Sequence, residues 1–299
     1  MQKRRVLVNG TSLEWAFEGF IRTKKAEGLS EATLKAYRYH FDAVAHHLDV
    51  RQDVEELKSS TVKAAIAEIA ETGISPNSIR SYTATLKSFF SWCSAEGLCD
   101  VKIGLYRGSE TVPETYSPDD LKTLLKRPKR RCTFAEFRSW VIVNVFVDTG
   151  MRAMSVRTLQ VRDVDLDAGV IRLRHVKNRT AQVLPISPML GKVLEEYLAI
   201  LHSEPEDPLF PSVSGEPLRD EALRNSIERY ERRRGVRPLG LHAFRHTFAR
   251  LYLQGCDGNA LKLQKLLGHS TLDMTKKYVR IFDRDLVNDF QTKSPLSVL

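Results

Sequence analysis

One short part of the chain, residues 161–187, has a convincing strand pattern, whereas apolar residues elsewhere recur at helical spacing. In this part the apolar runs Val164–Leu166, Val170–Leu173 and Gln182–Ile186 are separated by turn-forming residues. The pattern predicts a small antiparallel three-stranded sheet. The chain is therefore expected to be mainly α, with one all-helical domain and one α+β domain that contains the sheet.

A break in the helical patterns at residues 104–117 separates two domains. Apolar residues recur from Leu13 to Leu48 with an interruption at residues 27–30, and Ser75-Pro76 opens a later helix that ends near Gly97. We predict a compact helical domain over residues 10–103. Periodicity fails over 104–117, where Gly, Ser, Thr and Pro accumulate, so these residues are predicted to be a linker.

The second domain is predicted to cover residues 118–299. Ser117-Pro118 has the composition of a helix start. The apolar stretch 140–147 suits a buried helix that ends at Gly150. Helical patterns follow the sheet at 189–201, 219–233, 243–254, 259–267 and 271–280.

The basic charge of the chain is concentrated in the second domain. The net charge is +9. Residues 1–110 carry 15 Lys+Arg and 14 Asp+Glu, whereas the remaining residues carry 31 and 23. A net positive charge of this kind favours a polyanionic partner such as DNA. The second domain is expected to make most of the electrostatic contribution to DNA binding.

Other features of the composition argue against membrane, secretory or metal-binding classes. No apolar run approaches the roughly 20 residues that span a bilayer, and the basic start of the chain is not followed by the apolar segment of a signal peptide. The four cysteines lack a paired metal-binding spacing. We therefore expect a cytoplasmic protein that holds no structural metal.

Several charged residues of the second domain are weak signals when each is taken alone. Arg152 follows the end of a buried helix, where a cation more often caps helix carbonyls than performs catalysis. Lys177 lies in a predicted hairpin turn, where most lysines are simply solvated. His242 and Arg245 are three residues apart, which places them on one face of a helix.

Two later residues complete this set. His269 follows a glycine that ends a helix, and Tyr278 lies nine residues further on, where a packed aromatic is the ordinary interpretation. Together, however, the set is what phosphodiester cleavage by a side-chain nucleophile requires. A tyrosine hydroxyl, with an ordinary pKa of about 10, needs cations and a base to become a good nucleophile.

Each member of the set then has a predicted role. Arg152 and Arg245 would hold the non-bridging phosphate oxygens, and Lys177 would protonate the departing sugar oxygen as general acid. His242 and His269 would supply hydrogen bonds and proton transfer. Because these groups already neutralise the phosphate, we expect catalysis without a metal, ATP or any other cofactor.

These residues resemble the tyrosine recombinase (phage integrase) family over nearly the whole chain. The most specific segments are Leu241–Ala249, Leu266–Ser270 and Tyr278, together with Thr149–Arg152 and the lysine segment 177–180. The resemblance implies a SAM-like core-binding domain and a catalytic domain that together clamp double-stranded DNA. It also implies a 3′-phosphotyrosyl intermediate and strand exchange by a homotetramer on a site with inverted half-sites, in a bacterial-type cell, on the nucleoid. An accessory DNA-bending or directionality factor is a further expectation.

One position departs from the family pattern. Three residues after the first arginine the family usually has an acidic residue that steadies the site, whereas this chain has Ser155. The chain otherwise resembles the simpler two-domain members, similar to Xer-like and transposon integrases. Residues 281–299 contain a short apolar periodicity that would suit a tail packed in cis or docked on a neighbouring protomer.

Two basic runs and the hairpin arginine are candidates for phosphate contacts that position DNA without reading its sequence. On their own, such runs are usually solvated surfaces. The candidates are Lys126, Arg127, Lys129, Arg130, Arg131, Arg179, Arg232, Arg233 and Arg234.

Two other functions fit parts of the same pattern. A type IB topoisomerase-like enzyme would use a similar set of groups to relax supercoils, and a non-catalytic DNA-binding accessory protein would keep the fold with a decaying site. The separate helical domain and the apolar tail favour recombination over relaxation. The intact set of six polar residues argues against decay, since costly unpaired cations should be lost first.

Overall fold

The computed structural model describes residues 11–108, 112–174, 182–256, 259–269, 271, 275–276 and 278–279. Packing divides the chain into two compact units, residues 1–111 and 112–299. This division falls inside the predicted linker 104–117. Among the described residues, the structure has no helix long and apolar enough to cross a membrane.

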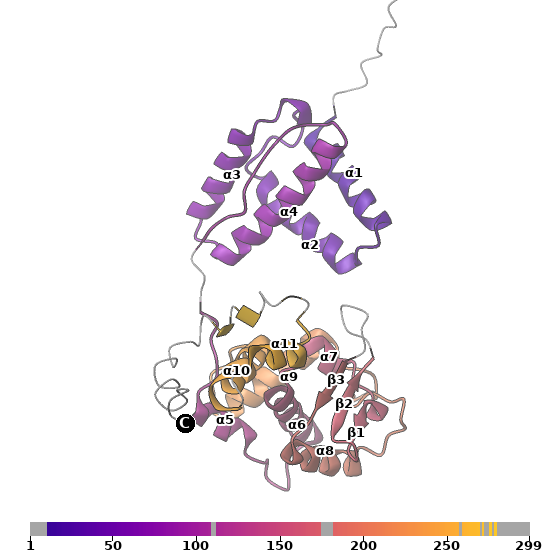
Figure 1. Cartoon of the computed structure of the whole chain (residues 1–299). Coiled ribbons are helices and arrows are strands. Elements are labelled where there is room, and N and C mark those ends of the chain that lie inside the picture. Colours follow the sequence, from indigo (N-terminus) through magenta and orange to yellow (C-terminus); the bar gives the residue numbers. More distant parts are fainter. Residues whose placement is uncertain are drawn as a thin grey trace, which may run out of the picture. The chain divides into compact units, whose positions relative to one another are not determined.

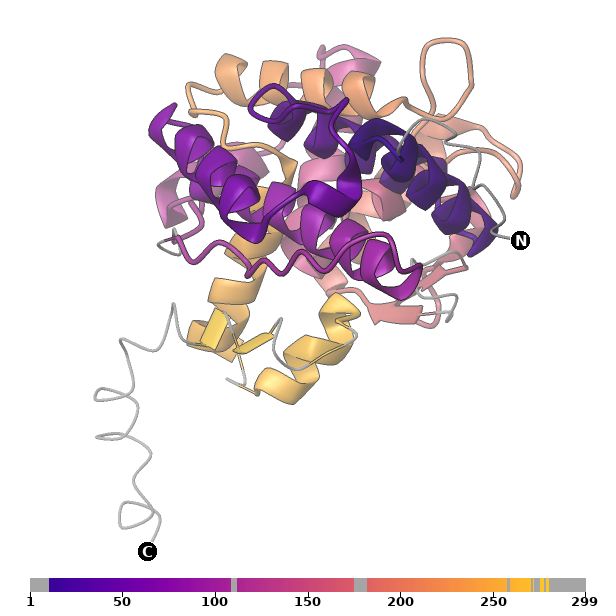
Figure 2. The same ribbon diagram turned by 90° about the horizontal axis from the view of Figure 1, so that it is seen from above.

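The first unit is helical, and its helices pack around one apolar core (indigo to magenta in Figures 1 and 2). Aromatic rings dominate that core, with Phe17 stacked on Phe41 at a centroid distance of 3.8 Å and Phe89 edge-on to Phe17. Ser30 and Ser75 cap helices by accepting from the backbone N–H groups of Thr33 and Ser78. The elements are α1 (Leu13–Ala26), α2 (Glu31–Ala45), η1 (Val54–Glu56), α3 (Ser59–Glu71) and α4 (Pro76–Ala95).

The second unit is built around one helix that is buried on nearly all sides. This helix, α6, packs against α8, α9 and α10, and the sheet lies beside this group (Figure 1). A helix that is apolar all round can be stable only inside a core. The helices are α5 (Pro118–Leu125), α6 (Phe134–Thr149), α7 (Ala153–Arg157), η2 (Val161–Asp163), α8 (Pro188–Leu201), α9 (Asp220–Arg233), α10 (Leu241–Leu251), η3 (Tyr252–Cys256) and α11 (Ala260–Leu267).

The sheet is antiparallel with strand order β1-β2-β3. Its strands are β1 (Val164–Asp165), β2 (Val170–Leu173) and β3 (Gln182–Pro185). Ile171 faces Leu184 across the β2–β3 pair, and both side chains are buried in the core of the unit. The predicted fold class, mainly α with a small three-stranded antiparallel sheet, is confirmed.

Details of the helical predictions differ at the ends of elements. The predicted helix 243–254 begins at Leu241, directly after Gly240, and changes into the π-helical turn η3 after Leu251. The helix α2 ends at Ala45, although Leu48 beyond it still packs on the core. Of the predicted helix 271–280, residues 275–276 and 278–279 are helical and residue 271 is a bend, and the others lie outside the described residues.

Both ends of the predicted linker segment are anchored to the unit that they adjoin. In the first unit, the backbone N–H of Tyr106 donates to Thr83 Oγ1 at 3.1 Å. In the second unit, Tyr116 is fully buried, and its backbone N–H donates to Thr247 Oγ1 at 3.0 Å. Arg250 adds a donor to the Tyr116 carbonyl at 2.7 Å. The entry of the chain into the second unit is thus attached to α10.

A buried carboxyl group completes this attachment. The Tyr116 hydroxyl donates to Glu231 and accepts from the backbone N–H of Leu239 at 3.2 Å. Glu231 is 1% exposed, and burial raises the pKa of its carboxyl to about 7. The folded protein therefore binds this proton more tightly than the unfolded chain does.

Replacing Glu231 by Gln should flatten the dependence of stability on pH. Because the folded pKa lies above the ordinary 4.5, protonation contributes stability that is complete below pH 4.5 and is lost as pH rises to about 7. Between pH 4.5 and pH 8 the wild type should lose up to about 3 kcal/mol of unfolding free energy relative to Glu231→Gln. Urea unfolding across this range measures the difference. Glu221→Gln, an exposed position on the same helix, should leave the profile unchanged.

Candidate active site

The site begins at the turn between α6 and α7. Gly150 ends α6 with φ +62°, a left-handed conformation that glycine adopts without strain. A Cβ at this position would lie 2.3 Å from Phe248 Cδ1 of α10. The close approach lets Arg152, the N-cap residue of α7, lie beside α10.

Gly150→Ala should destabilise the second unit by about 1–3 kcal/mol, because the methyl group adds both a clash and an unfavourable φ. Urea unfolding measures the change. Gly191→Ala is the matched control: Gly191 lies within α8, and an added Cβ would meet no described atom outside its own helix backbone within 4 Å, so the same change should be neutral or slightly stabilising. Equal losses in the two variants would contradict the packing argument at Gly150.

The carboxyl end of α11 is where side chains from distant segments meet. Arg245 Nη2 donates to the Leu267 carbonyl at 2.7 Å, and Arg152 Nη1 donates to the same oxygen at 3.4 Å. Gln182, at the start of β3, donates from Nε2 to the Lys265 and Leu266 carbonyls at 2.8 Å each. The last carbonyls of a helix have no partner within the helix, so these donors satisfy them.

Arg245 is a buried cation with a second carbonyl partner. It is 3% exposed, and its Nη1 donates to the Gly150 carbonyl at 2.9 Å. Burial and the neighbouring Arg152 lower the pKa of its guanidinium to about 10, so it stays charged at neutral pH. Among the described residues, neither guanidinium forms an ion pair with an Asp or Glu side chain. Two fixed positive charges without a carboxylate suit the binding of an anionic group.

The histidines beside these arginines are held in their neutral form. Burial, Arg245 and Arg152 lower the pKa of His269 to about 4. His269 is buried, and its Nδ1 lies 2.8 Å from the Thr275 hydroxyl, which fixes the ring. His242 keeps a solvent-accessible surface, yet partial burial of its ring and the same two guanidiniums hold its pKa below the ordinary value. At neutral pH both imidazoles can accept a proton.

Tyr278 lies between two of the site histidines. Its ring stacks on His269 with an interplanar angle of 2° and a centroid distance of 6.0 Å. His246 Nδ1 lies 3.0 Å from its hydroxyl oxygen. Burial raises the pKa of the Tyr278 hydroxyl, and Arg245 and Arg152 oppose that rise. The hydroxyl is therefore protonated at neutral pH, in an environment where two cations would stabilise the phenolate.

The structure brings five of the six predicted catalytic residues into electrostatic reach of one another, namely Arg152, His242, Arg245, His269 and Tyr278. The sixth, Lys177, lies outside the described residues, as does Arg179. The strands on either side of that segment, β2 and β3, are described, and Gln182 attaches the start of β3 to α11. The catalytic roles of these residues remain predictions.

Three residues at the site were not predicted from the sequence. His246 lies four residues after His242 on α10, a spacing that places two side chains on one helix face and was a usable signal. Thr275 holds His269, and Gln182 holds the end of α11. These last two contacts join segments far apart in the sequence or across a turn, so no local pattern indicates them.

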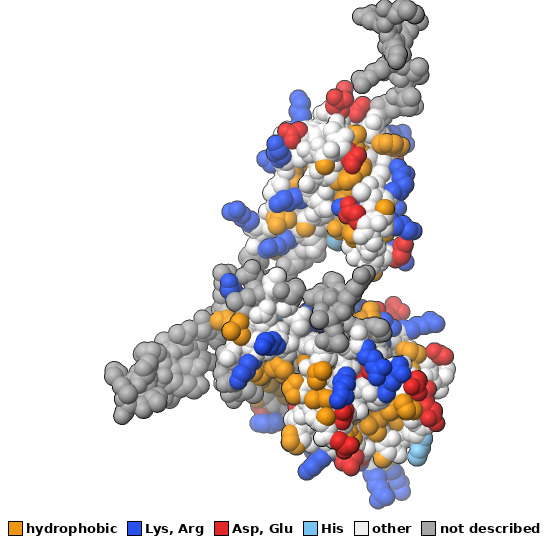
Figure 3. All heavy atoms as spheres, turned by 45° about the vertical axis from the view of Figure 1, so that its right-hand side comes forward, with side chains coloured by type: hydrophobic (Ala, Val, Ile, Leu, Met, Phe, Trp, Pro, Cys, Tyr) orange, Lys and Arg blue, Asp and Glu red, His pale blue; other side chains and the backbone are white. Residues whose placement is uncertain are grey.

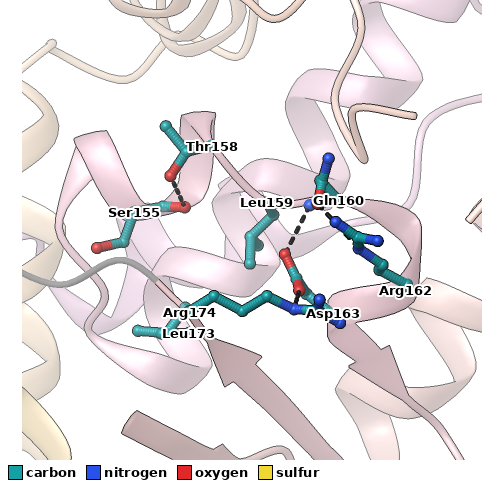
Figure 4. A pocket seen from close by; sticks show the side chains of 8 residues that line it. All are labelled: Ser155, Thr158, Leu159, Gln160, Arg162, Asp163, Leu173 and Arg174. Carbon is teal, nitrogen blue, oxygen red and sulfur yellow. Dashed lines mark hydrogen bonds and ion pairs between the residues drawn. The ribbon is translucent and has the colours of Figure 1, made fainter. Parts of the chain in front are cut away.

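Ser155, the departure from the family pattern, lines a pocket of about 260 Å³ below α7 (Figure 4). Across this pocket Asp163 is buried, accepts from the Gln160 backbone N–H at 2.9 Å and pairs with Arg174 Nε at 2.8 Å. This acidic side chain is thus engaged with the end of β2. Arg152 is held instead by the Leu267 carbonyl.

The predicted DNA-contact residues stay a prediction, and two of them already have protein partners. Arg127 pairs with Glu196, and Arg234 lies over the Tyr230 ring at 5.0 Å. The loop between α5 and α6, which carries the first basic run, lies at the opposite edge of the second unit from α7 and α11 (Figure 1). On the face of the molecule in Figure 3, Lys and Arg side chains are scattered among acidic ones.

Comparison with known proteins decides the family. The sequence profile described as "Phage integrase family" matches residues 114–284, more than half of the chain. The profile described as "Phage integrase, N-terminal SAM-like domain" matches residues 18–97. The chain belongs to the phage integrase family. It is a tyrosine-type site-specific recombinase.

Relatives and solved structures agree with this assignment over most of the recombinase. The tyrosine recombinase XerC of Thermodesulfovibrio yellowstonii is 28% identical over 288 residues, covering 92% of this chain and 94% of the relative. The fold is shared with a lambda integrase dimer bound to a core site, at a TM-score of 0.71 and 20% identity over 90% of this chain and 77% of that one. It is also shared with the Tn1549 transposon integrase in complex with circular intermediate DNA, at a TM-score of 0.74 and 17% identity, covering 89% and 94% of the two chains.

Proposed function

We propose that this recombinase cuts one strand of double-stranded DNA by attack of the Tyr278 hydroxyl on a phosphodiester, which leaves a 3′-phosphotyrosyl bond and a free 5′-hydroxyl. A 5′-hydroxyl from another strand then attacks the phosphotyrosine and joins the strands. The bond energy is kept in the covalent intermediate, so rejoining needs no ATP. The observation that carries the proposal is the meeting of a buried tyrosine hydroxyl with two guanidiniums that lack a described carboxylate partner.

The roles of the other residues follow from the charge that develops during attack. Negative charge grows on the non-bridging oxygens, and Arg152 and Arg245 are placed to hold it. Arg245 is already oriented by the Gly150 and Leu267 carbonyls, so little reorganisation is needed at the moment of reaction. His242, with its accessible surface, is proposed to contact the phosphate. Lys177 is proposed to protonate the departing 5′-oxygen.

Assembly and place of action are part of the same proposal. A solved lambda integrase structure that shares this fold is a tetramer bound to a Holliday junction, at a TM-score of 0.71 and 19% identity over 93% of this chain and 81% of that one. We propose that this recombinase likewise acts as a homotetramer on inverted half-sites, in the cytoplasm on the nucleoid. An accessory DNA-bending or directionality factor and a phosphate-binding role for the basic runs are further parts of the proposal.

The test is covalent trapping on DNA. The protein is incubated in EDTA with nicked duplexes built from the DNA that flanks its gene, so that the cut fragment diffuses away and rejoining cannot occur. We expect a protein–DNA species that survives SDS, and peptide mapping should place the DNA on the peptide containing Tyr278. An adduct on another residue, or cleavage only with a divalent metal, would contradict the proposal.

A second assay separates recombination from the topoisomerase alternative. Plasmids with two copies of the trapped site should yield recombinant products. Relaxation of supercoiled plasmids that lack the site, without recombinants, would instead favour a type IB topoisomerase-like activity.

A further inference from the structure

His246 is a site residue that contacts the proposed nucleophile directly. It lies on α10, one turn after His242, and the two rings meet edge to face at a centroid distance of 4.8 Å. Its Nδ1 lies 3.0 Å from the Tyr278 hydroxyl oxygen, and the two ring centroids are 5.5 Å apart. This is hydrogen-bond distance between an imidazole nitrogen and the oxygen that would attack phosphorus.

We propose that His246 is a further catalytic residue of the recombinase, the general base that takes the Tyr278 proton during strand cleavage and returns it during rejoining. The inference rests on the proposed role of Tyr278 as the nucleophile. It adds a third proposed catalytic residue to α10, which already carries His242 and Arg245.

The other groups around the hydroxyl are poorly suited to this task. The guanidiniums of Arg152 and Arg245 have no lone pair with which to accept a proton. They can stabilise the phenolate once it forms, but the proton has to leave to another group. An imidazole that is neutral at the working pH is the side chain best matched to that transfer.

Geometry separates His246 from the other two histidines. His269 is stacked on the Tyr278 ring, and its Nδ1 is engaged with Thr275 at 2.8 Å. His246 Nδ1, by contrast, lies at hydrogen-bond distance from the Tyr278 hydroxyl oxygen. His242 has the more accessible ring, which suits contact with the phosphate from solvent.

The proposed step balances in protons and bonds. The Tyr278 Oη–H proton moves to Nδ1 of His246, the Oη–P bond forms, and the P–O5′ bond breaks as the general acid protonates the 5′-oxygen. In rejoining, a 5′-hydroxyl attacks phosphorus and gives its proton back to the deprotonated general acid, the P–Oη bond breaks, and the His246 imidazolium returns its proton to Tyr278. For this sequence His246 must begin with its proton on Nε2.

The tautomer of His246 in the wild-type protein is therefore the first test. Long-range proton–nitrogen NMR correlations on histidine-labelled protein at neutral pH distinguish Nε2–H from Nδ1–H, with His246→Asn identifying the signal. We expect Nε2–H. A neutral ring that carries its proton on Nδ1 would donate to Tyr278 rather than accept from it, and that result would overturn the proposal.

The second test is cleavage by His246→Asn on suicide duplexes under single-turnover conditions. The asparagine amide reaches about the same place as Nδ1 and keeps a hydrogen bond, but it cannot take the proton. Cleavage should fall by about 10²–10⁴-fold, the usual contribution of general base catalysis. DNA affinity and the unfolding midpoint should stay close to the wild type, which separates this loss from misfolding. A variant that cleaves like the wild type would reduce His246 to a positioning residue.

Substrates with sulfur in place of the bridging 5′-oxygen show on which side of phosphorus His246 acts. A thiolate leaves without being protonated, so a general-acid variant such as Lys177→Ala should recover on this substrate. His246→Asn should not recover, because the tyrosine still has to lose its proton. Recovery of His246→Asn would place the residue on the leaving-group side and contradict the proposal. Loss of the adduct on both substrates by His246→Asn, with Tyr278→Phe retaining adduct, would instead overturn the proposed nucleophile.

Discussion

Tyr278→Phe should abolish the covalent DNA adduct while leaving the protein folded and able to bind DNA. The phenyl ring keeps the stacking on His269 and fills the same buried space, so the variant lacks only the hydroxyl oxygen. Without this oxygen no phosphotyrosine can form, and SDS-stable species should fall to background. Gel shifts on the same nicked duplexes should show unchanged affinity.

The matched control is Tyr197→Phe. Tyr197 is a fully buried tyrosine of the same unit whose hydroxyl has no hydrogen-bond partner among the described residues, and it lies in the core rather than at the site. Its variant should form the adduct at the wild-type rate. Adduct formation by Tyr278→Phe would show that another residue is the nucleophile.

The sequence alone was sufficient to predict the helices and strands that short residue patterns indicate. Pro76 and Pro118 follow serine caps, and both helices begin there in the structure. The three strands within residues 164–187 pair antiparallel, as predicted. In each case the interacting residues lie within one helix turn or between strands that follow each other in the chain, so a pattern of residue types can predict them.

The contacts that orient the site residues join segments far apart in the sequence, so local residue patterns do not predict them. Arg245 meets the Gly150 carbonyl and Gln182 meets the end of α11 across long separations in sequence. The motif identified Arg245 by its residue type and spacing from His242. It did not indicate that Gly150 allows α6 to approach Phe248 so closely, because that depends on packing between helices.

Arg152 shows why residue type alone does not decide whether a side chain has a structural or a catalytic role. As a cation after a buried helix it was expected, by default, to cap helix carbonyls, and it does donate to one, that of Leu267. The helix is α11, however, rather than α6, which it follows in the chain. Capping α11 places the Arg152 guanidinium beside Arg245, so one contact serves both the ordinary structural role and the proposed catalytic one.

The second large effect is expected from Arg245→Lys. Lysine keeps the charge but cannot donate at once to the Gly150 carbonyl, the Leu267 carbonyl and a phosphate in the fixed planar geometry of a guanidinium. The loss of one preorganised electrostatic contact to a transition state typically costs about 10²–10³-fold in rate. Single-turnover cleavage should fall by that factor. The free energy of unfolding should also fall, by about 1–3 kcal/mol, because a buried carbonyl loses its donor.

The variant Arg250→Lys distinguishes a loss of cleavage rate from a loss of unfolding free energy. Arg250 lies on the same helix and also donates twice, to Thr115 Oγ1 at 2.6 Å and to the Tyr116 carbonyl at 2.7 Å, but at the entry of the chain into the unit. Its replacement should lower the stability of the unit to a similar degree and leave the cleavage rate of the folded enzyme within a few-fold of the wild type. If both variants lost cleavage in proportion to stability, Arg245 would be a structural link between α6, α10 and α11. A selective loss in Arg245→Lys would instead place its guanidinium on the reacting phosphate.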